Sequence, residues 1–267
     1  MSGTQSVSLE RYEGNDRIVS SIELQARISQ QRTEPLIVKS GFPTLDRHIG
    51  GFHEGELYAI SGPTKNGKTL FAQSLTLNAV ERGEFPLWFT YEVPARQFLN
   101  QFETLPHFYM PAKLKAYNME WLSNRIVESF LKYGTRLIFI DHLHYLFDIS
   151  KTRNTSIEIG SVIRKLKGLC VEHGLCIFIL CHTVKGKSDD NLSYESIRDS
   201  SFVSQESDSV FMIRRTPNKG EDTAEMRIEF HRRTGVLEKK VKLKKVGRYL
   251  QEVVERPEGD KEPWWNK

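Results

Sequence analysis

A phosphate-binding loop is the clearest chemical feature of the sequence. The segment Gly62-Pro-Thr-Lys-Asn-Gly-Lys68-Thr69 fits the pattern G-x-x-x-x-G-K-[ST], and it lies between an apolar segment and a helical pattern that ends near Gly83. In such a loop, backbone N–H groups and the helix N-terminus bind phosphate oxygens, the lysine reaches the β- and γ-phosphates, and the hydroxyl binds magnesium. The alternative is a glycine-rich turn that precedes a helix by chance.

We therefore predict ATP and Mg²⁺ as cofactors. The residues expected to bind the nucleotide from this loop are Gly62, Pro63, Thr64, Lys65, Asn66, Gly67, Lys68, Thr69 and Leu70.

Two carboxylates follow apolar segments that read as strands. Asp141 is the first charged residue after residues 137–140, so we expect it to bind magnesium together with Thr69. The alternative is that Asp141 caps a turn. Glu92 follows residues 86–91 and is expected to activate water at the same sheet edge, with Glu103 and Glu120 as the other available glutamates.

The elements that must position these residues form an α/β pattern. From residue 56 to residue 180, short apolar segments alternate with longer segments of helical period, which predicts a mainly parallel central sheet with helices on both faces. The strongest helical pattern covers residues 156–173 and ends at Gly174. Beyond residue 207, apolar and charged residues alternate over 210–213, 226–230 and 241–246, which predicts a C-terminal antiparallel β extension.

Composition excludes several classes of protein. The chain has 267 residues, of which 39% are hydrophobic and 27% charged, enough for one large core without disulfide support. Three cysteines without metal-ligand spacing predict reduced, buried thiols. No apolar segment approaches the roughly 20 residues that span a bilayer, and the first thirty residues lack a secretory signal, so we expect a cytoplasmic protein with no membrane partner. The net charge of +4 does not by itself indicate nucleic-acid binding.

We divide the chain into three parts. Residues 1–34 read as a polar tail with a candidate linker helix over 19–32, residues 35–254 as the ATPase domain, and residues 255–267 as a disordered tail.

The order and spacing of several segments resemble the RecA-type ATPase domain of the DnaB-like replicative helicases, over roughly residues 41–253. The segments that carry the resemblance are Gly41-Phe-Pro-Thr-Leu-Asp46, the phosphate loop, Phe89-Thr-Tyr-Glu92, Ile140-Asp141-His-Leu-His-Tyr-Leu146 and Leu180-Cys-His182. The resemblance implies a RecA-like P-loop fold with Glu92 as the catalytic glutamate. It also implies that His182 senses the γ-phosphate, where a core histidine is the alternative.

The segment His231-Arg232-Arg233 matches the position where the family carries Lys-x-Arg. The resemblance implies that Arg233 projects into a neighbouring subunit's ATP site as an arginine finger, and that His231 replaces the lysine that contacts the nucleotide. An exposed strand-end arginine is the alternative. The expected catalytic residues are therefore Lys68, Glu92, His182 and Arg233.

The family further implies a homo-oligomer, usually a hexameric ring around single-stranded DNA, with 5′-to-3′ movement and a primase or helicase loader as partner. Such a protein works in the cytoplasm or nucleoid at the replication fork, or in an organellar matrix. The candidate DNA contacts are Lys185, Lys187, Arg198 and Arg153, and solvated surface loops are the alternative. Rival functions are a RecA/RadA-like recombination ATPase and a KaiC-like signalling ATPase.

Overall fold

The computed structural model describes residue 14 and residues 16–30, 35–147, 155–183, 201–216 and 222–253. The predicted tail over residues 255–267 therefore lies outside the described residues. The chain divides into two compact units, residues 1–35 and 36–267. In the first unit, α1 (Ser21–Gln30) forms where the sequence predicts a helix over residues 19–32, and none of its residues is buried.

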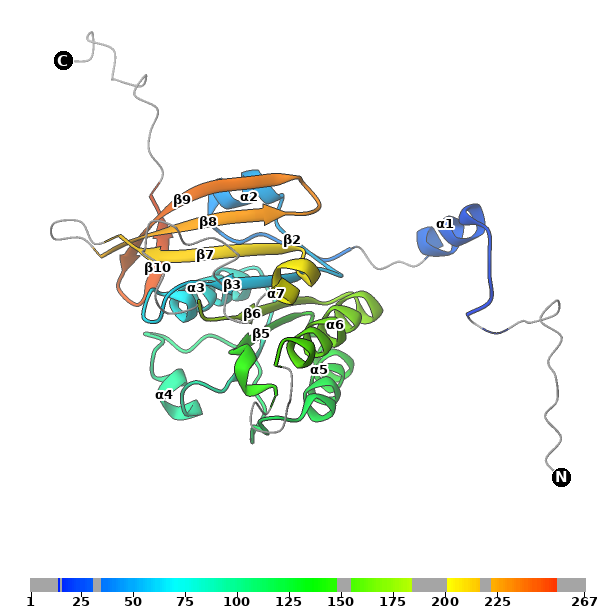
Figure 1. Ribbon diagram of the computed structural model, residues 1–267, viewed down its shortest axis with the longest axis horizontal. Coiled ribbons are helices and arrows are strands. Elements are labelled where there is room, and N and C mark those ends of the chain that lie inside the picture. Colours follow the sequence, from blue (N-terminus) through cyan, green and yellow to red (C-terminus); the bar gives the residue numbers. More distant parts are fainter. Residues whose placement is uncertain are drawn as a thin grey trace, which may run out of the picture. The chain divides into compact units, whose positions relative to one another are not determined.

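The second unit is built on one eight-stranded sheet, in the order β10-β9-β8-β7-β3-β6-β5-β4 (Figure 1). Strands β7, β3, β6, β5 and β4 pair in parallel, and β8, β9 and β10 continue the sheet in antiparallel fashion. This arrangement confirms the predicted α/β fold with its antiparallel extension. The strands are β3 (Leu57–Ser61), β4 (Leu87–Thr90), β5 (Leu137–Asp141), β6 (Cys176–Leu180), β7 (Ser209–Arg215), β8 (Thr223–His231), β9 (Val236–Val246) and β10 (Tyr249–Glu252).

Helices cover both faces of the parallel strands (Figure 1). Side chains alternate across a strand, so Tyr58 and Ile60 of β3 face one layer while Leu57 and Ala59 face the other. The first layer contains α2 (Pro43–Ile49) and α3 (Lys68–Val80). The second contains α5 (Met119–Tyr133), α6 (Thr155–His173) and α7 (Ser201–Glu206). Because both faces are buried, the parallel strands need the unbroken apolar sequences from which we predicted them.

The remaining elements are short. A two-stranded sheet joins β1 (Ile37–Val38) to β2 (Phe52–His53), α4 (Ala95–Leu99) follows β4, and the 3₁₀ helix η2 (Leu143–Tyr145) follows β5.

Aromatic rings stack across the parallel strands on the α2 and α3 side. Trp88 stacks on Phe139 with ring centroids 4.8 Å apart, Phe139 on Phe178 at 4.9 Å, and Phe178 on Tyr58 at 4.9 Å. These four residues come from β4, β5, β6 and β3, and all are fully buried. Stacked aromatic pairs contribute about 0.5–1.5 kcal/mol each beyond the burial of their area. The rings therefore help to fix the relative positions of four neighbouring strands.

The antiparallel extension is longer than the sequence predicts. Strand β8 begins at Thr223, where it pairs with Lys244 of β9. Strand β9 begins at Val236, because the turn at residues 234–235 lets His231 pair directly with Val236. Strand β10 was not predicted. It follows a turn between paired Val246 and Tyr249, in which Gly247 adopts a φ of 57°.

Two further predictions concern the core and membranes. Cys170, Cys176 and Cys181 are buried free thiols, as predicted. Among the helices of the described residues, none is both long enough and apolar enough to cross a bilayer.

The stacked rings lead to a first prediction. We expect Phe178→Ala to lower the free energy of unfolding by about 3–5 kcal/mol, because Phe178 is fully buried and contacts Phe52, Tyr58 and Phe139. The matched control, Phe85→Ala, removes a ring that is 37% exposed and should cost less than Phe178→Ala does. Urea unfolding of both variants measures the difference, and equal losses would contradict the proposed role of the stacked rings.

Candidate active site

The phosphate loop connects β3 to α3, as the sequence predicts. Gly62 has a φ of 147°, and a Cβ added to it would lie 2.1 Å from the carbonyl oxygen of Ile213 in β7. Gly67 has a left-handed φ of 94° just before the first residue of α3. Both glycines of the motif are thus required by the backbone. Gly62 leaves no room for a side chain beside Ile213, and Gly67 adopts a left-handed conformation that favours glycine.

Lys68 folds back over this loop. Its side chain is buried, and its Nζ donates to the carbonyl oxygens of Gly62 and Pro63 at 2.9 Å each. Burial lowers the pKa of Lys68, and the nearby carboxylates of Glu92 and Asp141 act in the opposite direction. A bound phosphate would offer this ammonium group stronger acceptors than the two carbonyl groups.

Thr69 and Asp141 form a pair at the start of α3 and the end of β5. The Thr69 hydroxyl donates to Asp141 Oδ2 at 2.9 Å. Asp141 is 2% exposed, and burial raises its pKa to about 7 although the Thr69 hydrogen bond acts to lower it. A desolvated carboxylate beside a hydroxyl fits Mg²⁺, which prefers hard oxygen ligands. The residues expected to bind magnesium therefore suit that ion.

These groups line one cavity of about 610 Å³. The cavity volume lies in the range of small-molecule sites. Of the predicted site residues, the structure brings together Thr64, Lys65, Asn66, Gly67, Lys68, Thr69, Leu70, Glu92, Asp141 and His182. Gly62 and Pro63 do not line the cavity, but their carbonyl oxygens accept the hydrogen bonds from Lys68.

The same cavity contains polar residues that we did not predict, namely Gln73, Asn100, Gln101, Lys245 and Arg248. Lys245 and Arg248 come from the end of β9 and the following turn, where alternating Lys and apolar residues read as a solvated strand face. The Arg248 guanidinium donates to the Asn100 carbonyl oxygen at 2.7 Å, which ties the β9–β10 turn to the segment after α4. Gln73 lies on α3 four residues after Thr69, so its place beside the loop could have drawn attention to it. No local signal marks Lys245 and Arg248, since they reach the cavity only through strand order.

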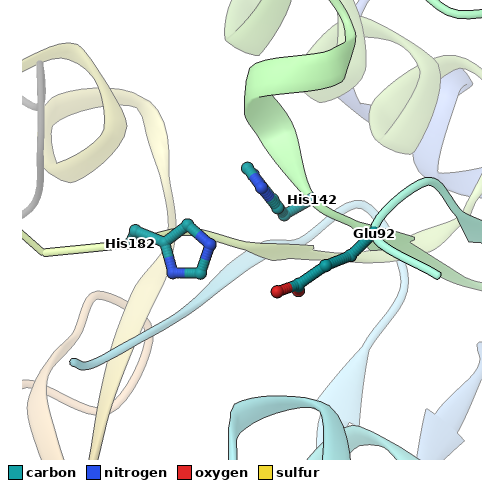
Figure 2. A group of neighbouring side chains, drawn as sticks. All are labelled: Glu92, His142 and His182. Atoms are coloured by element: carbon teal, nitrogen blue, oxygen red, sulfur yellow. The ribbon is translucent and has the colours of Figure 1, made fainter. Parts of the chain in front are cut away.

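Glu92 and His182 converge with a third side chain, His142 (Figure 2). The three residues follow β4, β6 and β5, and the rings of His142 and His182 lie 4.4 Å apart between centroids. Burial, assisted by His182 and His144, lowers the pKa of His142 to about 3, so this ring is neutral near pH 7. We did not single out His142 from the sequence, although its position directly after Asp141 could have drawn attention to it.

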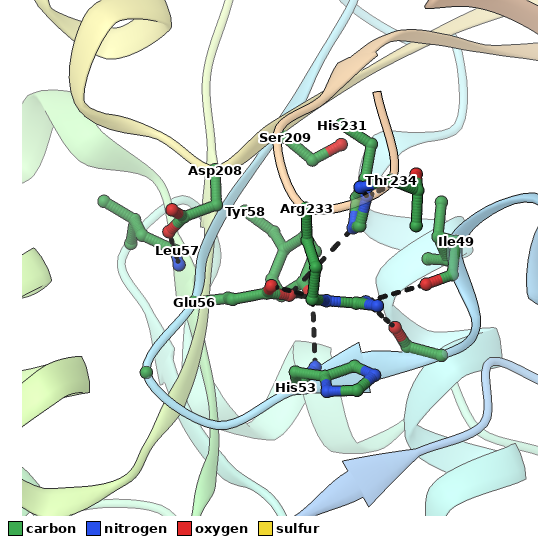
Figure 3. Close-up of polar contacts among 12 residues, drawn as sticks. Ile49, His53, Glu56, Leu57, Tyr58, Asp208, Ser209, His231, Arg233 and Thr234 are labelled. Atoms are coloured by element: carbon green, nitrogen blue, oxygen red, sulfur yellow. Dashed lines mark hydrogen bonds and ion pairs between the residues drawn. The ribbon is translucent and has the colours of Figure 1, made fainter. Parts of the chain in front are cut away.

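Arg233 and His231 lie elsewhere, at the other end of β3 (Figure 3). The Arg233 Nε donates to Glu56 Oε1 at 2.8 Å, and its Nη2 donates to the carbonyl oxygens of Ile49 and Gly51 at 2.7 and 3.1 Å. Glu56 precedes β3, whereas the phosphate loop follows that strand. Neither Arg233 nor His231 lines the nucleotide cavity of its own chain.

His231 is held in the same network. It is 1% exposed, its Nδ1 lies 2.8 Å from Thr234 Oγ1, and its ring stacks on Tyr58. The Tyr58 hydroxyl in turn donates to Glu56. Burial lowers the pKa of His231 to about 4. Nucleotide contact by His231 therefore stays a prediction, and it concerns a neighbouring subunit's site.

The candidate DNA contacts lie outside the described residues. They are Arg153, Lys185, Lys187 and Arg198. His182 lies three residues before Lys185 in the chain.

Family profiles match most of the second unit. The profile described as "DnaB-like helicase C terminal domain" matches residues 107–251, and the profile described as "ATPase: KaiC" matches residues 38–108.

Curated relatives match the same region. The "Replicative DNA helicase DnaB" of Pasteurella multocida is 23% identical over 217 residues, which are 67% of this chain and 46% of that protein. The "Probable replicative DNA helicase" of Trieres chinensis is 22% identical over 253 residues, which are 79% of this chain and 56% of that protein. The chain thus spans about half the length of these relatives.

Two solved structures share the fold. One, described as "The Structure Of A DnaB-Like Replicative Helicase And Its Interactions With Primase", has a TM-score of 0.72 at 17% identity, covering 86% of this chain and 66% of that chain. The other, of an isolated ATPase domain, has a TM-score of 0.72 at 16% identity, covering 87% of this chain and 97% of that chain. Because the DnaB-like profile matches more than half of the chain, and the fold agrees, the chain belongs to the DnaB-like helicase C-terminal domain family.

Proposed function

We propose that this chain hydrolyses ATP with Mg²⁺ and uses the reaction to move on single-stranded DNA and unwind duplex during replication. The observation that carries the proposal is the convergence of Lys68, the Thr69–Asp141 pair, Glu92 and His182 on one cavity. The names of the curated relatives support replication as the process. Movement from 5′ to 3′ is part of the proposal by family resemblance.

Each residue has a distinct role in the proposed reaction. The loop N–H groups and Lys68 hold the β- and γ-phosphates, and Thr69 and Asp141 hold the magnesium ion. When bound, that ion neutralises charge on the phosphates. Glu92, exposed at the cavity edge, orients water and accepts its proton. His182 contacts the γ-phosphate and links the cavity to the chain that follows β6.

The position of Arg233 supports a shared active site. Arg233 lies at the end of β3 opposite to the phosphate loop, so it is remote from its own nucleotide site. Its side chain is 33% exposed. We propose that the subunits form a ring, usually of six. In that ring Arg233 would leave Glu56 and the two carbonyl groups and contact the ATP of a neighbouring subunit.

The proposed partners follow from the same function. We propose single-stranded DNA as the ligand of the ring's centre, contacted by Lys185, Lys187, Arg198 and Arg153. A primase or helicase loader is the proposed protein partner, because one structural neighbour is a DnaB-like helicase described together with its primase interactions. The protein would then work at the replication fork.

A signalling ATPase is the second candidate function, because the KaiC profile matches residues 38–108, which include the phosphate loop. DNA dependence of ATP turnover separates the two functions.

The first functional prediction concerns that turnover. We expect single-stranded DNA to stimulate steady-state ATP hydrolysis at about 0.1 M salt, where exposed charges are already partly screened. Lys68→Ala should lower turnover more than about a hundredfold, because it removes a cation from the phosphates. Lys132→Ala, whose side chain on α5 is 59% exposed, is the matched control and should keep normal turnover. Normal hydrolysis by Lys68→Ala would refute the phosphate site, and DNA-independent hydrolysis would favour signalling.

A second prediction tests the catalytic glutamate. Glu92→Gln should retain ATP binding but lose about 10²–10⁴-fold in kcat, because the amide cannot accept the proton from water. Glu103→Gln and Glu120→Gln are matched controls, since both residues are exposed and neither lines the cavity. Nucleotide-binding fluorescence and single-turnover hydrolysis measure the two effects separately. If one control variant lost turnover while Glu92→Gln stayed active, the glutamate changed in that control would be the catalytic one.

A third prediction tests the shared interface. Arg233→Ala should bind ATP normally and lose about 10³–10⁵-fold in turnover. Mixing it with Lys68→Ala subunits should restore activity, because about a quarter of the interfaces in random head-to-tail rings then carry both intact residues. ATPase rates of mixtures at several ratios measure the recovery. A mixture as inactive as its two components would contradict a site shared between subunits.

A further inference from the structure

Glu92, His142 and His182 bring three potential metal ligands to one point (Figure 2). They follow β4, β5 and β6, which are neighbours in the sheet. One ligand atom from each residue lies within 4.8 Å of the others. Among the described residues, no other group of three or more His, Cys, Asp or Glu side chains brings its ligand atoms this close together.

The donor set favours a particular class of ion. Two imidazole nitrogens and one carboxylate suit Zn²⁺ and similar transition-metal ions, whereas Mg²⁺ and Ca²⁺ prefer oxygen ligands. With Zn–ligand bonds of about 2.0–2.2 Å, ligand atoms in a tetrahedral site lie about 3.3–3.5 Å apart. Closing the group from its present spacing requires side-chain movement, to which the exposed Glu92 side chain can contribute.

Contacts with His144 orient the His142 ring. The His144 backbone N–H donates to His142 Nδ1 at 3.3 Å, and the Nδ1 of the His144 ring lies at the same distance from that atom. These contacts hold the His142 ring in its orientation beside Glu92 and His182.

We propose that Glu92, His142 and His182 form a binding site for one Zn²⁺-like transition-metal ion, beside the Thr69–Asp141 magnesium pair. Occupation of this site engages the Glu92 carboxylate and the His182 ring, and it therefore stops ATP turnover. The inhibition rests on the proposed function, whereas the binding of the ion does not.

The nitrogen and sulfur side chains that could compete for the ion all belong to the part of the chain that the structure describes. All eight histidines and all three cysteines lie among the described residues. The cysteines are buried, and burial raises the pKa of Cys170 and of Cys181 to about 12, which disfavours the thiolate that binds metals. Binding measured on the whole chain can therefore be traced by histidine variants.

The test measures metal binding by the nucleotide-free whole chain in millimolar MgCl₂, which occupies oxygen-ligand sites. Equilibrium dialysis with Zn²⁺ should give one ion per chain, and Co²⁺ should give the visible absorption of a site with nitrogen ligands. His142→Gln and His182→Gln should each weaken binding by at least about tenfold, since each removes a ligand. His107→Gln, which changes an exposed histidine outside the group, is the matched control.

A variant at the buried His142 could lose its fold, so Glu92→Gln provides an independent test. Glu92 is exposed, and its variant should keep the wild-type melting temperature while binding Zn²⁺ at least about tenfold more weakly. Binding of less than one ion per chain by the wild type, or unchanged affinity in Glu92→Gln, would overturn the proposal.

The inhibition is measured separately, as ATP turnover in Mg²⁺ with increasing Zn²⁺. Wild type and His107→Gln should be inhibited over the same Zn²⁺ range in which dialysis shows binding. Full turnover with the site occupied would overturn the inhibitory role. Zn²⁺ binding by a chain that hydrolyses no ATP would instead refute the proposed function and leave the metal site standing.

Discussion

The register of four parallel strands is the constraint on which the active site depends. Thr90 pairs with Asp141, Asp141 with Leu180, and Leu180 with Ile60, so the four strands end in one row. Gly62, Asp141, His142, Glu92 and His182 all lie in this row or within two residues beyond it. Because a shift of one residue reverses the faces of a strand, the buried layers on both sides hold the register strictly. The stacked rings of Trp88, Phe139, Phe178 and Tyr58 add to the same restraint.

Sequence alone predicts the parts of the site that depend on local chemistry. The phosphate loop needs only its own glycines, Lys68 and Thr69, and the strand-end carboxylates follow apolar segments that cannot be mistaken for solvent-exposed strands. Lys245 and Arg248 escaped prediction because they reach the cavity through long-range pairing. They are about 180 residues from the loop in sequence, and no periodicity indicates that the β9–β10 turn lies beside it. His142 escaped prediction because it begins a segment that we interpreted as the apolar continuation of the strand.

The Arg233 network illustrates a different limit. A sequence motif can indicate that an arginine acts at the ATP site of a neighbouring subunit. It cannot indicate which groups bind that arginine in the isolated chain. Here Glu56 accepts from Arg233 and from the Tyr58 hydroxyl, and Glu56 is itself mostly buried. Removing one partner from a buried carboxylate is costly. In the ring proposed above, assembly must therefore supply compensating contacts before Arg233 leaves Glu56.

The phosphate loop packs directly against β7, because Gly62 closely approaches the backbone of Ile213. The Arg215 backbone N–H also donates to the Asn66 side-chain oxygen at 2.8 Å, so both ends of the loop rest on β7. At the other end of β7, the Ser209 hydroxyl donates to the carbonyl oxygen of Phe230, next to His231 and close in sequence to Arg233. One end of β7 therefore contacts the phosphate loop. Its other end is hydrogen-bonded to the end of β8, just before the turn that contains Arg233, the residue proposed to reach a neighbouring subunit.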